Sequence, residues 1–313
     1  MPDPARFVVT ITRAPIFDMS PRVSIITRTK DRPLFLARCL ASVEQQTYSN
    51  WVQVVVNDAG PVADVDALMA PLLARYPDKY LVLHRPQSTG MEAATNHGLT
   101  NSSGDLVTLL DDDDTWQPEF LATMVAAYQQ RRAGSVRGVV CRSVRIFETV
   151  RGTRIEELRR EIYNSGLWRV SLFEVAARNR FTVNAFLYER GVLDEIGLYR
   201  EDLPVVGDWE FNLRFLLRFD VDFIATPLAA FHVRQGRTNG TAGNTVSNST
   251  DLHQYYANLL QNEYLRADVA KGQMGLGHIM ANASAWSSTI DNIEWETRAL
   301  SPFNRLLSRI RGW

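Results

Sequence analysis

Cysteine is scarce in this chain, which has only Cys39 and Cys141 among 313 residues. Cys39 lies in an apolar helical pattern and Cys141 in an apolar strand pattern, so both are predicted to be buried, reduced thiols. A fold held together by disulfide bonds is therefore not expected.

Long apolar runs and excess charge are also missing. No stretch reaches the ~18 apolar residues of a membrane-spanning helix, and the first residues contain prolines and an early acid where a signal peptide needs an apolar segment. Because the 34 basic and 35 acidic side chains nearly cancel, a dedicated nucleic-acid partner is not expected. These absences predict a cytoplasmic globular protein whose ligand selectivity depends on local groups of residues rather than on its net charge.

What the first half of the sequence does contain is an alternation of short β-branched runs and helical patterns. Strands are expected at residues 23–27, 51–58, 80–84 and 106–110, and helices at 31–47, at 67–77 with a break at Pro71, and at 91–100. This alternation predicts parallel strands joined by right-handed crossovers, which is half of a doubly wound α/β sheet.

The second half is less regular. A helix is expected from Pro118 to about Arg132, strands at 138–147 and 223–234, helical spacing at 155–163, and a helix from Gly207 onward. Residues 234–250 contain almost nothing apolar, so we expect a segment that is mobile unless a ligand orders it. The remainder of the chain is helical in pattern.

Four consecutive aspartates, Asp111–Asp114, follow the apolar run LVTLL. Adjacent carboxylates repel one another, so such a cluster needs water or a cation to balance its charge. Mg²⁺ and Mn²⁺ prefer carboxylates together with substrate phosphates. The alternative is a solvated acidic turn or a helix cap. Polar residues also end two other strands, at 27–31 and 57–60, which favours a nucleotide site at one edge of the sheet.

Five motifs in this order resemble those of the family 2 glycosyltransferases of the GT-A fold: VSIITRTKDRP, VVVNDAG, ATNHGL, LLDDDDTWQPEFL and GDWEFNLR, within residues 22–234. The resemblance implies an α/β fold, a doubly wound, mostly parallel sheet flanked by helices. Residues 1–235 would form the GT-A domain, and residues 236–313 a mobile loop and a helical C-terminal extension.

The same resemblance implies an activity: inverting, hexosyl-type transfer from a nucleotide diphosphate sugar to an acceptor hydroxyl, in polysaccharide or glycoconjugate assembly. Mn²⁺ or Mg²⁺ would be the cofactor, UDP or dTDP the expected nucleotide, and a carbohydrate or lipid-linked carbohydrate the acceptor.

Site residues follow from the resemblance position by position. Nucleotide contacts are implied for Thr27, Arg28, Asp58, Asp111 and Asp112, metal ligation for Asp113, and the role of catalytic base for Asp208. Two positions depart from the family pattern. Asn57 stands where many members have an acid, which hardly affects nucleotide binding. Gly207 stands where many have an acid directly before the base, so assistance to Asp208 from a neighbouring carboxylate is in doubt.

Three candidate site residues in the second half of the chain, Asp208, Trp209 and His232, each have two interpretations. Asp208 is either the base or an ordinary helix N-cap. Trp209 either stacks on a sugar, as a substrate-binding residue, or anchors its helix in the core. His232 completes the metal site or is structural, and Arg234 would clamp the diphosphate. In relatives these last two stand in the reverse order.

The C-terminal segment carries Arg298, Arg305, Arg309 and Arg311 among apolar residues. It predicts either a basic helix that touches the inner face of a membrane or a solvated surface helix.

Three rival functions remain. The run LVTLLDDDDT also fits the D-x-D-x-T pattern of haloacid-dehalogenase-like phosphatases, although the only lysine after it is Lys271 and no Asp-Asp pair follows. A nucleotidyltransferase would need a glycine-rich loop that TRTKDRP lacks. A degenerate glycosyltransferase that only binds carbohydrate is favoured by Gly207.

Overall fold

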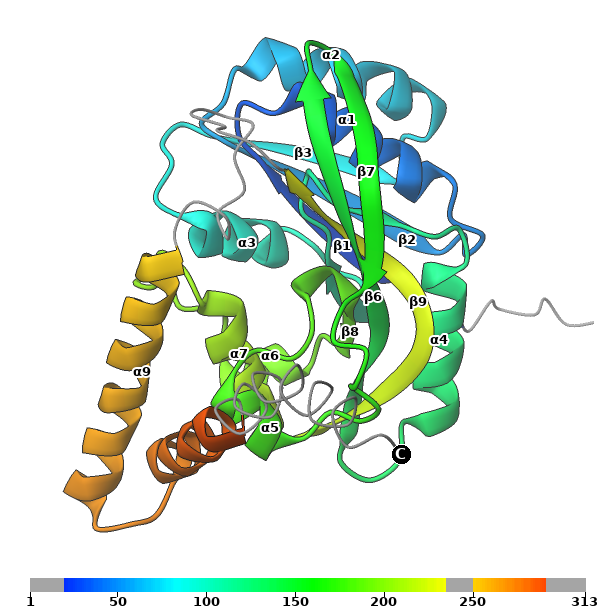
Figure 1. Ribbon diagram of the computed structural model, residues 1–313. Coiled ribbons are helices and arrows are strands. Elements are labelled where there is room, and N and C mark those ends of the chain that lie inside the picture. Colours follow the sequence, from blue (N-terminus) through cyan, green and yellow to red (C-terminus); the bar gives the residue numbers. More distant parts are fainter. Residues whose placement is uncertain (1–19, 235–249, 291–313) are drawn as a thin grey trace, which may run out of the picture.

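The computed structural model describes residues 20–234 and 250–290 of the chain. Its first half alternates strands and helices as the sequence predicts. The strands are β1 (Val23–Thr29), β2 (Trp51–Asp58), β3 (Tyr80–Arg85) and β4 (Leu106–Leu109), and the helices are α1 (Pro33–Glu44), α2 (Val62–Arg75) and α3 (Met91–Thr100). The four strands run parallel in the order β3-β2-β1-β4. Their carboxyl ends therefore share one edge of the sheet (Figure 1).

The second half extends this sheet with strands of mixed direction. Its strands are β5 (Thr115–Trp116), β6 (Val136–Arg151), β7 (Arg154–Ile162), β8 (Phe186–Glu189) and β9 (Asp220–Arg234). Its helical segments are α4 (Phe120–Arg131), α5 (Leu172–Ala177), the 3-10 turn η1 (Val183–Ala185), α6 (Val192–Ile196), α7 (Gly207–Leu216), α9 (Thr250–Lys271) and residues 276–290.

The direction of these strands brings the end of β9 to the edge where β4 ends. The sheet continues from β4 through β8, β6 and β9 to β5, and β7 pairs with β6. β8 is antiparallel to both β4 and β6, and β9 is parallel to β6. Because the direction reverses twice, β9 runs the same way as β4.

Helices cover both faces of the sheet because side chains alternate along each strand. On β1, Ile25 belongs to a buried cluster with residues of α1, α2 and α4, whereas Ile26 belongs to a cluster with residues of α3, α5 and α7. Leu260 of α9 and Met280 also join the second cluster. The described residues after 250 therefore share a hydrophobic core with residues 20–234.

Two predicted details are wrong. Pro71 lies inside α2 without ending it; it is exposed to solvent, so water can hydrate the carbonyl that proline leaves without a donor. Residues 155–163, predicted to be helical, largely form strand β7, because the turn at Gly152 folds this segment back onto β6. Pairing between strands overrides the local helical spacing.

Both cysteines are buried free thiols, as predicted. Among the described helices, none has the length and apolar character that crossing a membrane would require. The predicted mobile segment after Arg234 and the C-terminal arginines lie outside the described residues.

Candidate active site

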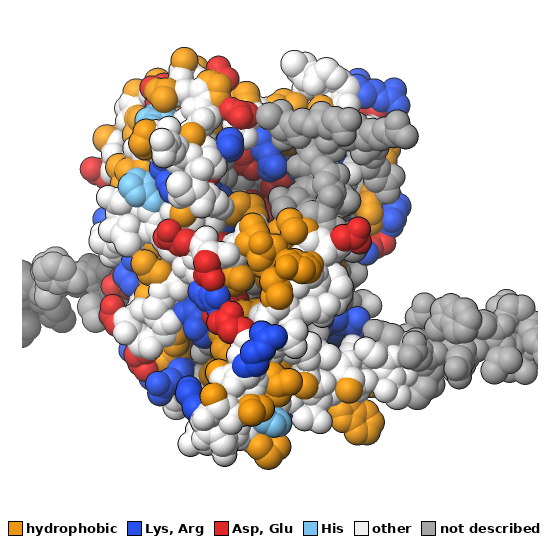
Figure 2. All heavy atoms as spheres, turned by 90° about the vertical axis from the view of Figure 1, so that its left-hand side faces the viewer, with side chains coloured by type: hydrophobic (Ala, Val, Ile, Leu, Met, Phe, Trp, Pro, Cys, Tyr) orange, Lys and Arg blue, Asp and Glu red, His pale blue; other side chains and the backbone are white. Residues whose placement is uncertain are grey.

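A large cleft of about 1630 Å³ opens at the strand ends and is lined by the residues that follow β1, β2 and β4. The N-terminal ends of α3 and α7, the end of β9 and one face of α9 complete its wall. Figure 2 shows acidic and basic side chains inside this hollow. The parallel strands thus bring together the polar ends that the sequence predicted to meet.

Asp111 faces Arg28 across the cleft. The guanidinium donates Nε to Oδ1 at 2.7 Å and Nη2 to Oδ2 at 3.2 Å, which is a bidentate pair. Its Nη1 reaches Thr95 Oγ1 at 3.0 Å and Glu92 Oε2 at 3.4 Å. Glu92, at the start of α3, was not among the predicted site residues.

Asp112 and Asp114 are buried and bound by protein groups, although both also line the cleft. Asp112 accepts a hydrogen bond from Thr29 Oγ1 at 2.7 Å and one from Arg32 at 3.2 Å. Asp114 accepts from Asn184 Nδ2 at 2.9 Å and from the backbone N–H of His232 at 3.1 Å. Burial and the neighbouring Asp113 raise the pKa of Asp112 to about 7 and that of Asp114 well above its usual range. A cation gripped by all four aspartates is therefore not what this geometry offers.

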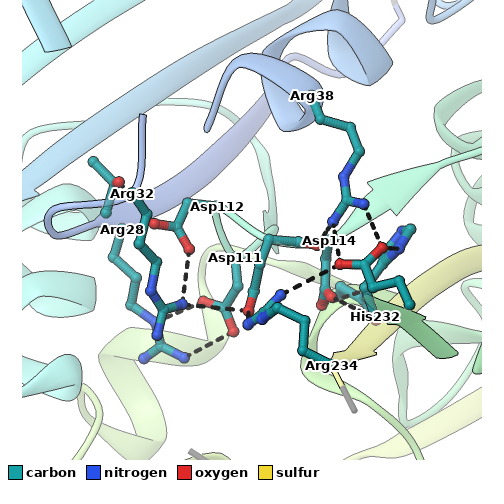
Figure 3. Close-up of polar contacts among 12 residues, drawn as sticks. Arg28, Arg32, Arg38, Asp111, Asp112, Asp114, His232 and Arg234 are labelled. Atoms are coloured by element: carbon teal, nitrogen blue, oxygen red, sulfur yellow. Dashed lines mark hydrogen bonds and ion pairs between the residues drawn. The ribbon is translucent and has the colours of Figure 1, made fainter. Parts of the chain in front are cut away.

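Asp113 belongs to a second network at the end of β9. Its carboxylate contacts Arg32 at 3.3 Å and forms an ion pair with Arg234. Arg234 also approaches Glu148 at 3.5 Å. Figure 3 shows these arginines converging on the acidic turn from separate strands and helices. Asp113, expected to bind the metal, and Arg234, expected to bind the diphosphate, thus lie in direct contact.

His232 has protein partners at both ring nitrogens. Nδ1 lies 2.8 Å from Glu148 Oε2, and Nε2 lies 2.9 Å from Thr115 Oγ1. A metal ion would have to displace one of these partners, so this conformation does not favour the predicted ligand role of His232. Glu148 also binds Arg38 at 2.6 Å. Although burial raises its pKa, the hydrogen bonds from His232 and Arg38 lower the pKa of Glu148 to about 2.

Asp208 lies in the first turn of α7, with its carboxylate at the cleft. It accepts hydrogen bonds from Asn179 Nδ2 and from the backbone N–H of Trp209, both at 2.8 Å. The N-cap position belongs to Val206, whose φ of 59° is unusual for a β-branched residue. Burial raises the pKa of Asp208, and the Trp209 N–H and Arg28 counteract this effect. Asp208 is therefore not the N-cap, and its half-buried carboxylate lines the cleft.

Trp209 anchors α7. It is 7% exposed, and its indole N–H donates to the carbonyl of Val175 at 2.6 Å. Its ring belongs to the buried cluster of the α7 face, although it also lines the cleft. The core-anchor interpretation accounts for these contacts, and a stacking role would leave only the cleft-facing edge to a sugar.

The two remaining predicted nucleotide residues differ in accessibility. Thr27 is fully buried and accepts a hydrogen bond from Gln53 Nε2 at 2.9 Å, so its side chain does not reach the cleft, contrary to the prediction. Asp58 does line the cleft, where Ser88 Oγ donates to it at 2.6 Å and Arg85 forms an ion pair with it. β1 presents Arg28 and Thr29 to the cleft instead of Thr27.

The donor set at this site suits a hard divalent cation. Within residues 20–234 and 250–290, no three His, Cys or carboxylate side chains are grouped as metal ligands. Mg²⁺ and Mn²⁺ usually take only one or two carboxylates and complete their shell with water and phosphate oxygens. The residues present therefore fit a cation held by Asp113 and Asp111.

Comparison with known proteins places this chain in a family. The model described as glycosyl transferase family 2 matches residues 24–196, more than half of the chain. The Bacillus subtilis protein named "Uncharacterized glycosyltransferase YwdF" is 29% identical over 195 residues, which cover 62% of this chain and 67% of the relative. A second relative from the same organism is 26% identical, and the match covers 61% of its length. The chain thus spans about two thirds of the length of these curated relatives.

Solved structures show the same fold at low sequence identity. Mannosyltransferase PcManGT from Pyrobaculum calidifontis, in complex with GDP-Man and Mn²⁺, has a TM-score of 0.56 and 17% identity, covering 90% of this chain and 84% of that chain. S. aureus TarS 1-349, in complex with UDP-GlcNAc, has a TM-score of 0.55 and 17% identity, covering 84% and 71%. These likenesses confirm the predicted fold class, a GT-A-like sheet flanked by helices with helices at the C-terminal end.

Proposed function

The chain belongs to glycosyl transferase family 2, and we propose that it is a metal-dependent, inverting glycosyltransferase of the hexosyl type. It would move a sugar from a nucleotide diphosphate sugar to an acceptor hydroxyl in polysaccharide or glycoconjugate assembly. The observation that carries this proposal is the opening of Asp111, Asp113 and Asp208 onto one cleft from the ends of β4 and the start of α7.

The nucleotide half of the donor would lie along the ends of β1, β2 and β4. Asp58 is held by Ser88 and Arg85 in a position to accept hydrogen bonds from a base. Asp111 is suited to accept from the ribose hydroxyls once Arg28 yields one of its two contacts. UDP or dTDP stays the proposed nucleotide. The neighbours bound to UDP-GlcNAc and GDP-Man support a sugar nucleotide in general and leave the base open.

A divalent ion, Mn²⁺ or Mg²⁺, would be held by Asp113 with Asp111. When bound, it would neutralise charge that grows on the departing diphosphate. Arg234 and Arg32 already bind Asp113, and both guanidiniums are suited to contact phosphate oxygens at the same place. The buried Asp112 and Asp114 hold this turn in position through Thr29 and Asn184.

Asp208 would accept the proton of the attacking acceptor hydroxyl. A base near neutral pH works best when its own proton affinity is raised, and burial has this effect on Asp208. Asn179 holds one carboxylate oxygen at 2.8 Å, and the Trp209 N–H holds the other. With one base and one departing diphosphate, transfer would occur in a single displacement, which inverts the configuration at the anomeric carbon.

The acceptor would enter beside α9, where the cleft is lined by amide and hydroxyl side chains. They are Gln254, Asn258, Gln261, Ser284, Ser287 and Ser288. Such neutral polar groups suit the hydroxyls of a carbohydrate. The acceptor is accordingly proposed to be a carbohydrate, free or lipid-linked.

Turnover of sugar nucleotides tests the proposal. The purified protein should release nucleoside diphosphate from at least one member of a donor panel, more slowly after chelation of divalent ions, with activity restored by Mn²⁺ or Mg²⁺. Nucleotide binding without turnover would favour the degenerate carbohydrate-binding alternative, and release of phosphate from simple phosphomonoesters would favour the phosphatase.

A further inference from the structure

A carboxyl group from α3 fills the space beside the proposed base. Gly207 directly precedes Asp208, and a Cβ built on it would lie 2.5 Å from Oε1 and 2.7 Å from Cδ of Glu92. Such distances are far below van der Waals contact, so no larger residue fits at 207 without moving Glu92. Glu92 is 4% exposed and lines the cleft. The glycine thus makes room for an acid contributed by a different helix (Figure 1).

Arg28 connects this acid to the donor side of the site. Its Nε and Nη2 bind Asp111, while Nη1 approaches Glu92 Oε2 at 3.4 Å. Glu92 is therefore one of two carboxylates that fix the direction of the Arg28 side chain. Removing it would leave Nη1 with Thr95 alone among its contacts in the described chain.

The charges around Glu92 come from three elements. Arg28 of β1 faces it, together with Asp111 after β4 and with Asp208 and Glu210 of α7. Burial raises the pKa of Glu92 to about 7; Arg28 opposes this, while the three acids add to it. Because Coulomb repulsion is mutual, an ionised Glu92 also increases the proton affinity of Asp208.

We propose that Glu92 is a positioning residue for the transfer reaction: it holds Arg28 against Asp111 and places a second carboxyl group beside Asp208 in the space left by Gly207. The inference rests on the proposed function. The inference predicts that the proton affinity of Asp208 increases as Glu92 ionises. The value of kcat should therefore rise as the pH increases through about 7.

Glu92→Gln tests this, because it removes the charge and preserves the shape. We would measure kcat and the KM for donor from about pH 5.5 to 8.5. The variant is expected to lose the rise in kcat near pH 7 and to be about tenfold slower above it, since one unit of base pKa is a tenfold change in proton affinity. The KM for donor should change by less than about threefold.

A second variant retains both Glu92 and Asp208 but displaces the side chain of Glu92. Gly207→Ala introduces the Cβ that collides with Glu92, and it should reproduce the loss of kcat. Gly191→Ala is the matched control, because its Cβ would meet nothing nearer than 3.8 Å; its kinetics should equal those of the wild type. The exchanged double variant, Glu92→Gly with Gly207→Glu, returns a carboxyl to the same space and should regain part of the activity that Glu92→Gly alone loses.

Thermal unfolding and nucleotide diphosphate affinity would establish that each variant is folded. If Glu92→Gln does not fold, Gly207→Ala and the exchanged pair decide the matter. Wild-type turnover with an unchanged pH profile and kcat in Glu92→Gln and Gly207→Ala overturns this inference alone. Absence of turnover by the wild-type protein overturns the proposed function, and the inference with it.

Discussion

The guanidinium of Arg28 binds Asp111 through two parallel hydrogen bonds, at 2.7 and 3.2 Å, across a separation of 83 residues in the sequence. Asp111 is the first residue of the acidic turn, and Arg28 is the next-to-last residue of the neighbouring strand β1. The acid expected to meet the ribose is thus already neutralised by a cation from the protein. The proposed donor would therefore have to exchange with this ion pair rather than enter an empty acidic pocket.

Loss of Arg28 should destabilise the protein. Arg28→Ala leaves Asp111 and the buried Glu92 without their counter-charge, so the free energy of unfolding should fall by roughly 3 kcal/mol, the cost of breaking a largely buried ion pair. Denaturant unfolding measures it. Arg75→Ala removes an exposed pair with Glu44 and should cost less than about 1 kcal/mol. Equal losses in the two variants would argue against a buried role for Arg28.

Asp208→Asn should abolish transfer and spare donor binding. The substitution removes the proton acceptor with little change of shape, and kcat should fall by about 100-fold or more, while the affinity for nucleotide diphosphate stays near that of the wild type. Steady-state kinetics and calorimetry separate the two effects. The control is Asp202→Asn, which alters an exposed carboxylate paired with Arg200. An undiminished rate in Asp208→Asn would show that another group is the base.

The acidic turn should divide into metal-binding and structural members. Asp113→Asn is expected to weaken Mn²⁺-dependent donor binding by about tenfold or more, and also to lower the melting temperature, because it removes the charge that faces the buried Arg234. Asp114→Asn should lower the melting temperature as well, because Asp114 accepts from both Asn184 and the His232 backbone, but it should leave the response of donor binding to Mn²⁺ unchanged. Donor titrations with Mn²⁺ and with chelator, beside thermal scans, test the contrast. The division fails if donor binding by Asp113→Asn responds to Mn²⁺ as in the wild type.

Glu148 should stabilise the protein at neutral pH and lose this effect in acid. Its pKa is about 2 in the folded protein, below the ordinary value of 4.5, so the folded state binds its proton less readily than the unfolded state. The contribution is fully present above about pH 4.5 and disappears as pH falls through 2. Glu148→Gln should therefore cost roughly 2 kcal/mol at pH 7 and much less near pH 2.

Denaturant unfolding of both proteins across this pH range measures the difference. Glu263→Gln is a suitable comparison, because Glu263 is exposed on α9 and forms an ion pair with Arg200, away from Glu148. A Glu148→Gln penalty that is independent of pH would mean that packing, rather than charge, is what Glu148 supplies.

The local sequence pattern predicted most of the helices and strands correctly. The predicted helix at 91–100 is α3, and the predicted strands of the first half are β1 to β4, with bounds that differ by at most two residues. It failed at Pro71 and at residues 155–163. In both places the deciding contact is not local: buried Val65 and Met69 hold α2 against the sheet, and β6 pairs with β7.

The candidate site was predicted in part. Asp58, Asp111 and Asp113 do line one cleft, because the ends of parallel strands must share an edge, and the start of α7 brings Asp208 to the same cleft. The predicted nucleotide contact of Thr27 is not supported, because side chains alternate along β1 and that of Thr27 points toward Gln53. Glu92 and Glu148 were missed. The available signal for Glu92 was Gly207 itself, a small residue where a larger one was expected.

The sequence by itself determined the order of strands and helices and the position of the acidic turn after a buried strand, because alternation and helical spacing record which side chains must leave water. Only the tertiary structure decided which aspartates face the cleft, which arginines neutralise them, and which acid stands beside Asp208. Those partners lie tens of residues apart along the chain, and strand register and helix packing, which no local pattern encodes, bring them within hydrogen-bond distance.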